Sequence, residues 1–464
     1  MPVLPRWFPW KPVRAYLKDT RGSLTTTIGI SIIPLIIAAG VAIDMARVAR
    51  EQTAFAGAVD SAALAVAASA RSDLTGLSST ALAARMQELK AYALKYIESN
   101  YTPQFNDDTA INVVLDVTST KVKLAASHDF PTTIMAISGI TELTLNAVTE
   151  VTKAGSSVEV ALILDNTGSM SGSRIAALKT AAKDFVNIVV QATQTPYYSK
   201  VALVPYTMGV NVGSTYATAA RGNITSGTST TPGYANYTFK NPSNQNKTFA
   251  ITDCVSERTG AAAYTDAAVA TNKVGRNYAA PGNLCAAAAI LPLTGNKTVL
   301  NGAIDAMVAG GSTGGQVGVA WGWYMLSPNF GLWSGTSVPA AYGTERLQKF
   351  AVLMTDGEYN SPYCNGVISK DATSGSGNIS DHINCNATNG NAYTQSEKLC
   401  AGMKAKGIVV YTVAFDLINT AAAQNLMTNC ATGSSHRYDA ANEAELKAAF
   451  KSIALDLQSL RLSK

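Results

Sequence analysis

A mostly apolar run that ends in an acidic residue is the strongest constraint on the fold of this chain. Residues 158–164 read VEVALIL, and Asp165 follows them. A short, β-branched apolar run bounded by turn residues predicts a buried strand of a parallel sheet. Residues 349–355 repeat the design and lead into Asp356. Helical and strand patterns alternate around both runs, so we expect an α/β fold with a doubly wound, mostly parallel sheet.

The expected sheet domain covers residues 156–464 and contains two polar insertions. Apolar periodicity predicts the following elements: helices at 175–189, 315–326, 396–406, 420–427 and 443–459, and strands at 200–206 and 408–415. The insertions, at about 207–296 and 358–392, are rich in Thr, Asn, Gly and Tyr and lack strong periodicity. Loops of this length are uncommon unless they are functional or carry structure of their own.

Six cysteines, all in the second half of the chain, indicate the compartment. None forms a C-x-x-C pair and the chain has three histidines, so a zinc site is not expected. An even number of cysteines beyond an apolar segment favours disulfides in an oxidising compartment, with buried thiols as the alternative. We favour the pairs Cys254–Cys285, Cys364–Cys385 and Cys400–Cys430.

An uncharged segment, residues 22–43, is long enough to cross a bilayer as a helix. Five basic residues and one acidic residue precede it, so the positive-inside rule places residues 1–21 in the cytoplasm. A cleaved signal peptide is the alternative. The helical pattern continues unbroken to Ala70, which favours a retained anchor, and Pro34 is tolerable within a membrane helix.

Residues 44–155 are expected to form a helical and small-sheet module. An Ala-rich helix continues from the anchor, and a second helix is expected at 80–98. Alternating patterns then predict strands at 111–117, 121–124 and 143–151. The net charge of the whole chain is only +5, and much of the excess precedes residue 22, so no nucleic-acid partner is expected.

Oxygen-bearing side chains gather where the predicted strands end. Asp165, Thr167 and Ser169 follow the first strand, Thr313 lies in the Gly-rich run 310–315, and Asp356 follows a later strand. Open α/β sheets place their ligands at the carboxyl ends of strands. Hydroxyl and carboxylate oxygens suit a hard cation such as Mg²⁺, with Mn²⁺ or Ca²⁺ as alternatives. A hydroxyl-rich turn that only caps the next helix would give the same local pattern.

This set of loops resembles the von Willebrand factor type A domain with a metal-ion-dependent adhesion site. That family carries D-x-S-x-S, a loop threonine and a later aspartate; here Thr167 replaces the first serine. The resemblance implies that Thr167 and Ser169 ligate the ion directly, and Thr313 directly or through water. Asp165 and Asp356 would hold coordinated waters. The ion would keep one position open for an acidic side chain of a partner, which is binding and not catalysis.

The amino-terminal part resembles the TadE/TadG module of Flp (tight-adherence) pilus assembly proteins. The similar stretches are RGS at 21–23, AGVAID at 39–44 and VDSAALA at 59–65, and AWGW at 320–323 also looks like TadG. The resemblance implies a single-pass inner-membrane protein with its bulk periplasmic or surface-exposed, bound to pilus-assembly or envelope proteins. Thr27 stands where prepilin processing at 22/23 would need a glutamate, so that cleavage is not expected.

Two other interpretations remain open. Residues 165–169, DNTGS, resemble the aspartyl-phosphate loop of haloacid-dehalogenase enzymes, in which Asp165 would be the nucleophile of a Mg²⁺-dependent phosphohydrolase. Such an enzyme also needs a lysine near the metal, and none stands out, so we expect no enzyme. The second alternative is a structural pilus-assembly scaffold whose metal site is vestigial.

Overall fold

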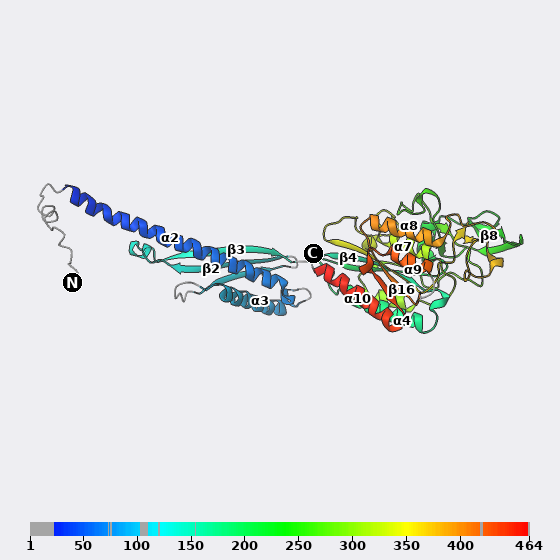
Figure 1. The fold of residues 1–464 in the computed structure, drawn as a ribbon, viewed down its shortest axis with the longest axis horizontal. Helices are drawn as coiled ribbons and strands as arrows, with labels where there is room; N and C mark the ends of the chain where they lie inside the picture. The colour runs from blue at the N-terminus through cyan, green and yellow to red at the C-terminus, as the bar shows by residue number, and fades with distance from the viewer. Residues whose placement is uncertain are drawn as a thin grey trace, which may run out of the picture. The chain divides into compact units, whose positions relative to one another are not determined.

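The structure, a computed structural model, describes residues 23–72, 74, 77–102, 110–118, 121–153, 155–417 and 421–462. The chain forms two compact units, Met1–Lys153 and Ala154–Lys464 (Figure 1). The basic segment expected at 1–21 and the tip of the hairpin at 119–120 lie outside the described residues.

A single long helix, α2 (Ser23–Ala68), begins the described part of the first unit. Among the described residues it is the helix long and apolar enough to cross a membrane. Its first half exposes apolar side chains such as Ile30 and Leu35, whereas Phe55 and Val59 further along are buried. The first half of the helix therefore exposes its apolar side chains, and the second half buries apolar side chains in the core of the unit.

The second half of α2 lies along a three-stranded antiparallel sheet (Figure 1). The sheet has the order β1-β2-β3, formed by β1 (Asn112–Val117), β2 (Lys121–Pro131) and β3 (Glu142–Thr152). The helix α3 (Ser79–Asn100) buries Leu89, Ala93 and Ile97, one residue per turn, which is the apolar stripe that its sequence predicts. The helices and strands expected in this region are present, and β2 extends well beyond the predicted residue 124.

Asp44 fastens α2 to the loop between β2 and β3. Its buried carboxylate accepts hydrogen bonds from the backbone N–H groups of Thr133, Ile134 and Met135 at 3.1, 2.7 and 2.8 Å. Gly40, one turn earlier, is needed there because a Cβ would come within 2.2 Å of Ile134. This contact anchors the helix immediately after the uncharged segment.

The second unit is built on a mixed sheet whose centre is parallel. The order is β11-β10-β6-β5-β4-β13-β16-β17, and β12 also pairs with β5. The parallel strands are β4 (Ser157–Asp165), β5 (Ser199–Tyr206), β13 (Leu347–Thr355), β16 (Val409–Phe415) and β17 (Arg437–Ala440). The antiparallel strands are β6 (Val210–Asn211), β10 (Cys254–Ser256), β11 (Gly275–Arg276) and β12 (Leu291–Thr294). The predicted doubly wound, mostly parallel sheet is confirmed.

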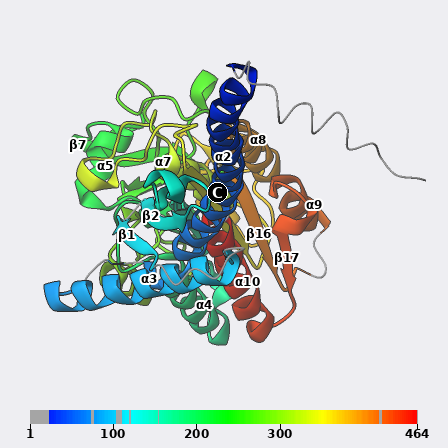
Figure 2. The ribbon, with the colours of Figure 1, turned by 90° about the vertical axis from the view of Figure 1, so that its left-hand side faces the viewer.

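Helices cover both faces of this sheet, as Figure 2 shows for the strands β16 and β17. On one face lie α4 (Ser173–Val189), α6 (Lys297–Asp305) and α10 (Glu443–Leu462). On the other lie α7 (Gly315–Leu326), α8 (Ala392–Ala405) and α9 (Ala421–Cys430). Side chains of a strand alternate between faces, so Leu162 packs in the core beneath α4, α6 and α10, and Ile163 packs in the core beneath α7, α8 and α9. Both faces being covered explains why every residue of β4 is buried.

The insertions carry secondary structure that the sequence pattern does not predict. The first contains α5 (Gly213–Arg221) and a sheet of β7 (Thr225–Ser229), β8 (Tyr234–Lys240) and β9 (Asn246–Ala250). The second contains the hairpin of β14 (Tyr363–Cys364) and β15 (Val367–Ile368). Tyr237 and Phe249 of the first insertion share a small core with Val367 of the second. Both insertions therefore carry structure of their own, which is one of the two possibilities that their length leaves open.

All three disulfide pairs favoured from the sequence are confirmed, and the described residues include no free cysteine. Cys254–Cys285 lies within the first insertion and Cys364–Cys385 within the second. Cys400–Cys430 links α8 to α9, two helices on the same face of the sheet.

Candidate metal centre

The candidate centre lies where the chain leaves the middle strand of the sheet. From β4 the chain continues through α4 to β5 on one side, while β13 flanks β4 on the other. This reversal is the topological switch point at which open α/β sheets bind ligands, outside the carboxyl ends of the strands. Three loops meet there, after β4, before α7 and after β13. Backbone hydrogen bonds join the first two, Gly168 N–H to Gly311 carbonyl at 2.9 Å and Gly310 N–H to Asn166 carbonyl at 2.8 Å.

Asp165 ends β4 with a fully buried carboxylate. Its Oδ1 accepts hydrogen bonds from the backbone N–H of Thr167 at 2.9 Å and from the Thr167 hydroxyl at 2.6 Å. Its Oδ2 accepts from the hydroxyls of Thr355 at 2.6 Å and Tyr206 at 3.1 Å. All these donors are neutral, and burial raises the pKa of Asp165 above its ordinary value. A nearby cation would stabilise its charged form.

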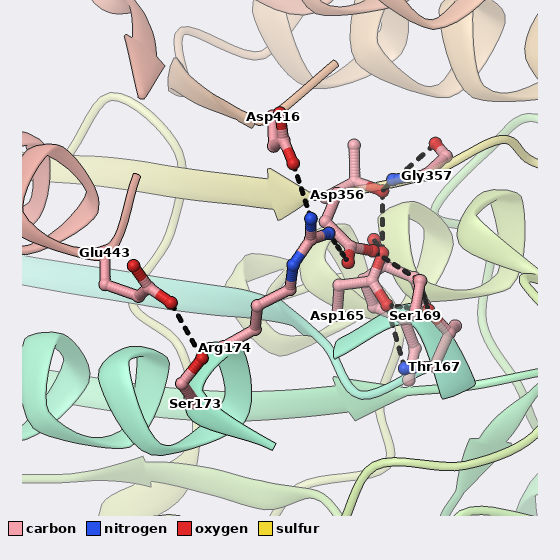
Figure 3. A network of polar contacts seen from close by, with 11 residues as sticks. Asp165, Thr167, Ser169, Ser173, Arg174, Asp356, Gly357, Asp416 and Glu443 are labelled. Atoms are coloured by element: carbon pink, nitrogen blue, oxygen red, sulfur yellow. Dashed lines mark hydrogen bonds and ion pairs between the residues drawn. The ribbon is translucent and has the colours of Figure 1, made fainter. Parts of the chain in front are cut away.

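Ser169 connects the first loop to the loop after β13. The Ser169 Oγ lies 3.0 Å from the Thr167 Oγ1 and donates to the Asp356 Oδ1 at 2.6 Å. Figure 3 shows this line of contacts from Asp165 through Thr167 and Ser169 to Asp356. The structure thus brings together four of the five side chains selected from the sequence.

Thr313 is held beside this network by its backbone. Its N–H donates to the Asn360 Oδ1 at 3.0 Å, and its carbonyl accepts from the N–H groups of Asn360 and Ser361 at 3.0 and 3.1 Å. Within the described part of the chain, Thr313 shares no hydrogen bond with the other four side chains. Its loop is nevertheless tied to theirs through the Gly310 and Gly311 contacts.

Arg174, which the sequence did not single out, borders the network (Figure 3). Its Nη1 lies 3.1 Å from the Asp356 Oδ2, its Nη2 donates to Asp416, and its guanidinium lies 5.5 Å from the centre of the Phe415 ring. Burial and, next, repulsion from Asp165 raise the pKa of Asp356 to about 6, although Ser169 and Arg174 lower it. Arg174 therefore compensates part of the charge at this end of the network.

The donor set fits a hard cation. Ligand oxygens around an octahedral Mg²⁺ lie about 2.0–2.1 Å from the ion, so adjacent ligands are about 2.9 Å apart. The 3.0 Å between the Thr167 and Ser169 hydroxyl oxygens matches that spacing. Each hydroxyl also donates its hydrogen to a carboxylate, Thr167 to Asp165 and Ser169 to Asp356. The lone pairs of both hydroxyl oxygens are then free to face a cation.

The residues that sequence reasoning missed support the carboxylates from neighbouring strands. Tyr206 is the residue of β5 in register with Asp165, and Thr355 is the last residue of β13. Their positions at strand ends could have identified them once the strand order was known. Arg174 could not be found in this way, because its partner Asp416 lies far along the chain after β16.

Comparison with protein families bears on the first unit. Residues 22–69 match a family model described as putative Flp pilus-assembly TadE/G-like. The matched residues lie almost wholly in α2 and make up about a tenth of the chain. The resemblance stated for this segment is therefore confirmed. No curated protein sequence matches the chain.

Solved structures similar to this chain include type A domains and pilus proteins. The vWF domain of the type V pilus tip protein Mfa5 from Porphyromonas gingivalis is 14% identical, with 66% of this chain and 97% of that chain covered and a TM-score of 0.37. The pilus adhesin SpaC from Lactobacillus rhamnosus GG is 16% identical, with 78% of this chain and 36% of that chain covered and a TM-score of 0.37. The von Willebrand factor type A protein from Catenulispora acidiphila is 11% identical, with 75% of this chain and 50% of that chain covered and a TM-score of 0.31. This chain thus spans about a third of SpaC, and similarity at this level does not assign a function.

Proposed function

We propose that this protein is a membrane-anchored component of Flp pilus assembly that binds a partner protein through a divalent cation. The observation that carries the proposal is the convergence of Asp165, Thr167, Ser169 and Asp356 at the carboxyl ends of β4 and β13. The match of residues 22–69 to pilus-assembly proteins supports the biological setting.

The side chains of this chain would hold the ion in a state that favours an acidic ligand. Thr167 and Ser169 would ligate it directly through neutral oxygens. Asp165 and Asp356 would accept the hydrogens of those hydroxyls and balance the charge of the ion without ligating it directly. Thr313 would add its oxygen directly or through water. When bound, Mg²⁺ supplies a Lewis-acidic centre, which is stronger when carboxylates do not ligate it directly. An Asp or Glu of the partner would then take the open position.

The amino-terminal helix would place this site outside the cytoplasm. Positive charge before residue 22 favours a cytoplasmic amino terminus. The three disulfides of the second unit fit an oxidising compartment. We propose a single pass through the bacterial inner membrane, with the second unit in the periplasm or at the surface.

A second candidate is a structural assembly scaffold with a vestigial metal site. The ion pair between Arg174 and Asp356 favours it, because a guanidinium already supplies a cation to one of the two buried carboxylates. The two candidates differ in what metal removal does to partner binding. The phosphohydrolase alternative is not proposed, because it needs a lysine near the metal. The groups that hydrogen-bond to Asp165 among the described residues are hydroxyls and one backbone amide.

The test is recovery of partners from envelope extract by the full chain, in Mg²⁺ and in EDTA. The wild type and Asp184→Asn, which removes an exposed carboxylate from α4, should recover the same proteins only in Mg²⁺. Asp165→Asn, of nearly unchanged size, should recover them in neither. Equal recovery by the wild type in EDTA would remove the metal mechanism and favour the scaffold.

A further inference from the structure

A half-open cavity of about 370 Å³ lies between the two insertions, and the metal centre does not use it. Its walls come from the end of α5, the strands β10 and β11, and the loop after β14. A backbone hydrogen bond from Val274 to Ala220 at 3.0 Å brings the end of α5 beside the segment that leads into β11. Three basic residues, Arg221, Lys273 and Arg276, therefore line one space.

Arg221 is the most unusual of these residues. Only 8% of its side chain is exposed, and its Nε and Nη1 are buried without a hydrogen-bond partner among the described residues. It forms an ion pair with the half-exposed Asp253, whose Oδ1 lies 3.6 Å from Nη2, beyond the length of a normal hydrogen bond. Buried donors are nearly always paired, because leaving them unpaired is costly. A guanidinium held in this state is suited to a ligand that supplies oxygen atoms.

Arg276 presents a second guanidinium with the same feature. Its Nε is buried and has no hydrogen-bond partner among the residues described. Its guanidinium lies beside two glycines: a Cβ on Gly233 would lie 3.5 Å from its Cζ, and one on Gly222 would lie 3.8 Å from its Nη2, both ordinary contact distances. Lys273 hydrogen-bonds to the Ala219 carbonyl at 2.8 Å and adds positive charge nearby.

The acidic residue in the wall does not neutralise the two arginines. Glu257 is buried, and its carboxylate accepts from Gln316 at 2.8 Å, Gln395 at 3.0 Å and the Tyr363 N–H at 3.3 Å. These neutral donors occupy the carboxylate. Neither Arg221 nor Arg276 forms an ion pair with Glu257 in the described part of the chain.

We propose that this cavity binds an oxyanion, a carboxylate or phosphate group, held between the guanidinium groups of Arg221 and Arg276. Guanidinium forks match the two oxygens of a carboxylate or phosphate, and charged hydrogen bonds of this kind are the stronger ones. The volume is within the range of small-molecule sites. Binding here is independent of the metal centre and of the proposed function, since it requires no divalent cation.

The test is calorimetric titration of the full chain in detergent, after divalent cations have been removed with EDTA and the EDTA itself, a tetracarboxylate, has been dialysed away. Two probes separate the sources of the oxyanion: inorganic phosphate and N-acetylglutamate. We expect at least one of them to bind. Binding of phosphate alone assigns a phosphate ligand, and binding of N-acetylglutamate alone assigns a carboxylate ligand. Arg221→Gln and Arg276→Gln should each weaken binding by at least about ten-fold.

Arg437→Gln, on β17 and outside the cavity, is the matched control and should bind as the wild type does. If Arg221→Gln does not fold, as judged by circular dichroism, the less buried Arg276→Gln decides the outcome. The proposal is overturned if neither probe binds at about 10 mM, a concentration at which millimolar sites are loaded. It is also overturned if the folded arginine variants bind as tightly as the control.

Discussion

Replacing Arg174 with glutamine should destabilise the second unit, and most strongly when no divalent cation is present. Arg174 joins Asp356, whose side chain is fully buried, to Asp416. Removing one partner of a buried ion pair costs about 3–5 kcal/mol. Arg174 is itself 33% exposed, so water screens part of the interaction, and we expect a loss of about 1–3 kcal/mol.

The loss can be measured by urea unfolding of the full chain in detergent, followed by tryptophan fluorescence. The tryptophans in the described residues are Trp321, Trp323 and Trp333, all in the second unit. In Mg²⁺ the loss should be smaller than in EDTA, because the ion supplies Asp356 with another positive charge.

A double-mutant cycle with Asp356→Asn identifies the partner. In the Asp356→Asn background the carboxylate charge at position 356 is absent. The part of the Arg174→Gln cost that comes from the Arg174–Asp356 ion pair should then fall below about 0.5 kcal/mol. This role of Arg174 is refuted if, in the wild-type background, Arg174→Gln costs less than about 0.5 kcal/mol in EDTA. It is also refuted if Asp356→Asn leaves the cost unchanged.

Three further predictions concern the surrounding structure. Replacing both Cys400 and Cys430 with serine should lower the free energy of unfolding by about 3–4 kcal/mol, as expected for a bridge that closes a loop of 30 residues, and urea unfolding would show it. Burial raises the pKa of Glu257 to about 7, so the stabilisation by its protonated form is complete below pH 4.5 and lost as the pH rises to about 7. Across that range the free energy of unfolding of the wild type should fall by roughly 3 kcal/mol relative to that of Glu257→Gln, measured by urea unfolding at each pH. Gly318→Ala would place a Cβ 2.6 Å from the Tyr206 ring, so this variant should bind Mg²⁺ more weakly in calorimetry even though it changes no proposed ligand.

Much of the sheet could be predicted because its central strands are buried on both faces. The strands β4 and β13 must then be apolar almost throughout, and a run of this kind between turn residues is visible without other information. The helix α4 was predictable for a similar reason, since its apolar residues form one stripe.

The sheet of the first insertion could not be predicted with the same ease. The strand β7 is mostly exposed and consists of Thr, Ser and Gly, so no apolar face marks it. The strand β8 has a weak signal, because Tyr237 and Phe239 alternate with polar residues and are buried. That burial depends on side chains from the second insertion, which sequence reasoning about one segment cannot supply.

Part of the candidate site could likewise be predicted from the sequence, and part of it could not. Asp165, Thr167 and Ser169 could be grouped because they lie within five residues of the sequence, and Asp356 because it follows a similar strand. Arg174 pairs directly with Asp356 and also with Asp416, more than 200 residues later in the chain, and only the fold creates these contacts. A sequence pattern therefore gives the candidate ligands, while the charge that balances them has to come from the structure.

Direct titration of Mg²⁺ into the EDTA-dialysed, metal-free full chain tests the central claim. Calorimetry of the wild type should reveal one Mg²⁺ site, with Mn²⁺ giving an electron paramagnetic resonance signal for the same site. Ser169→Ala and Asp165→Asn should both lose it, and Asp184→Asn should keep it. If the wild type binds no ion, or if Asp165→Asn binds Mg²⁺ as the wild type does, these four side chains are not a metal centre.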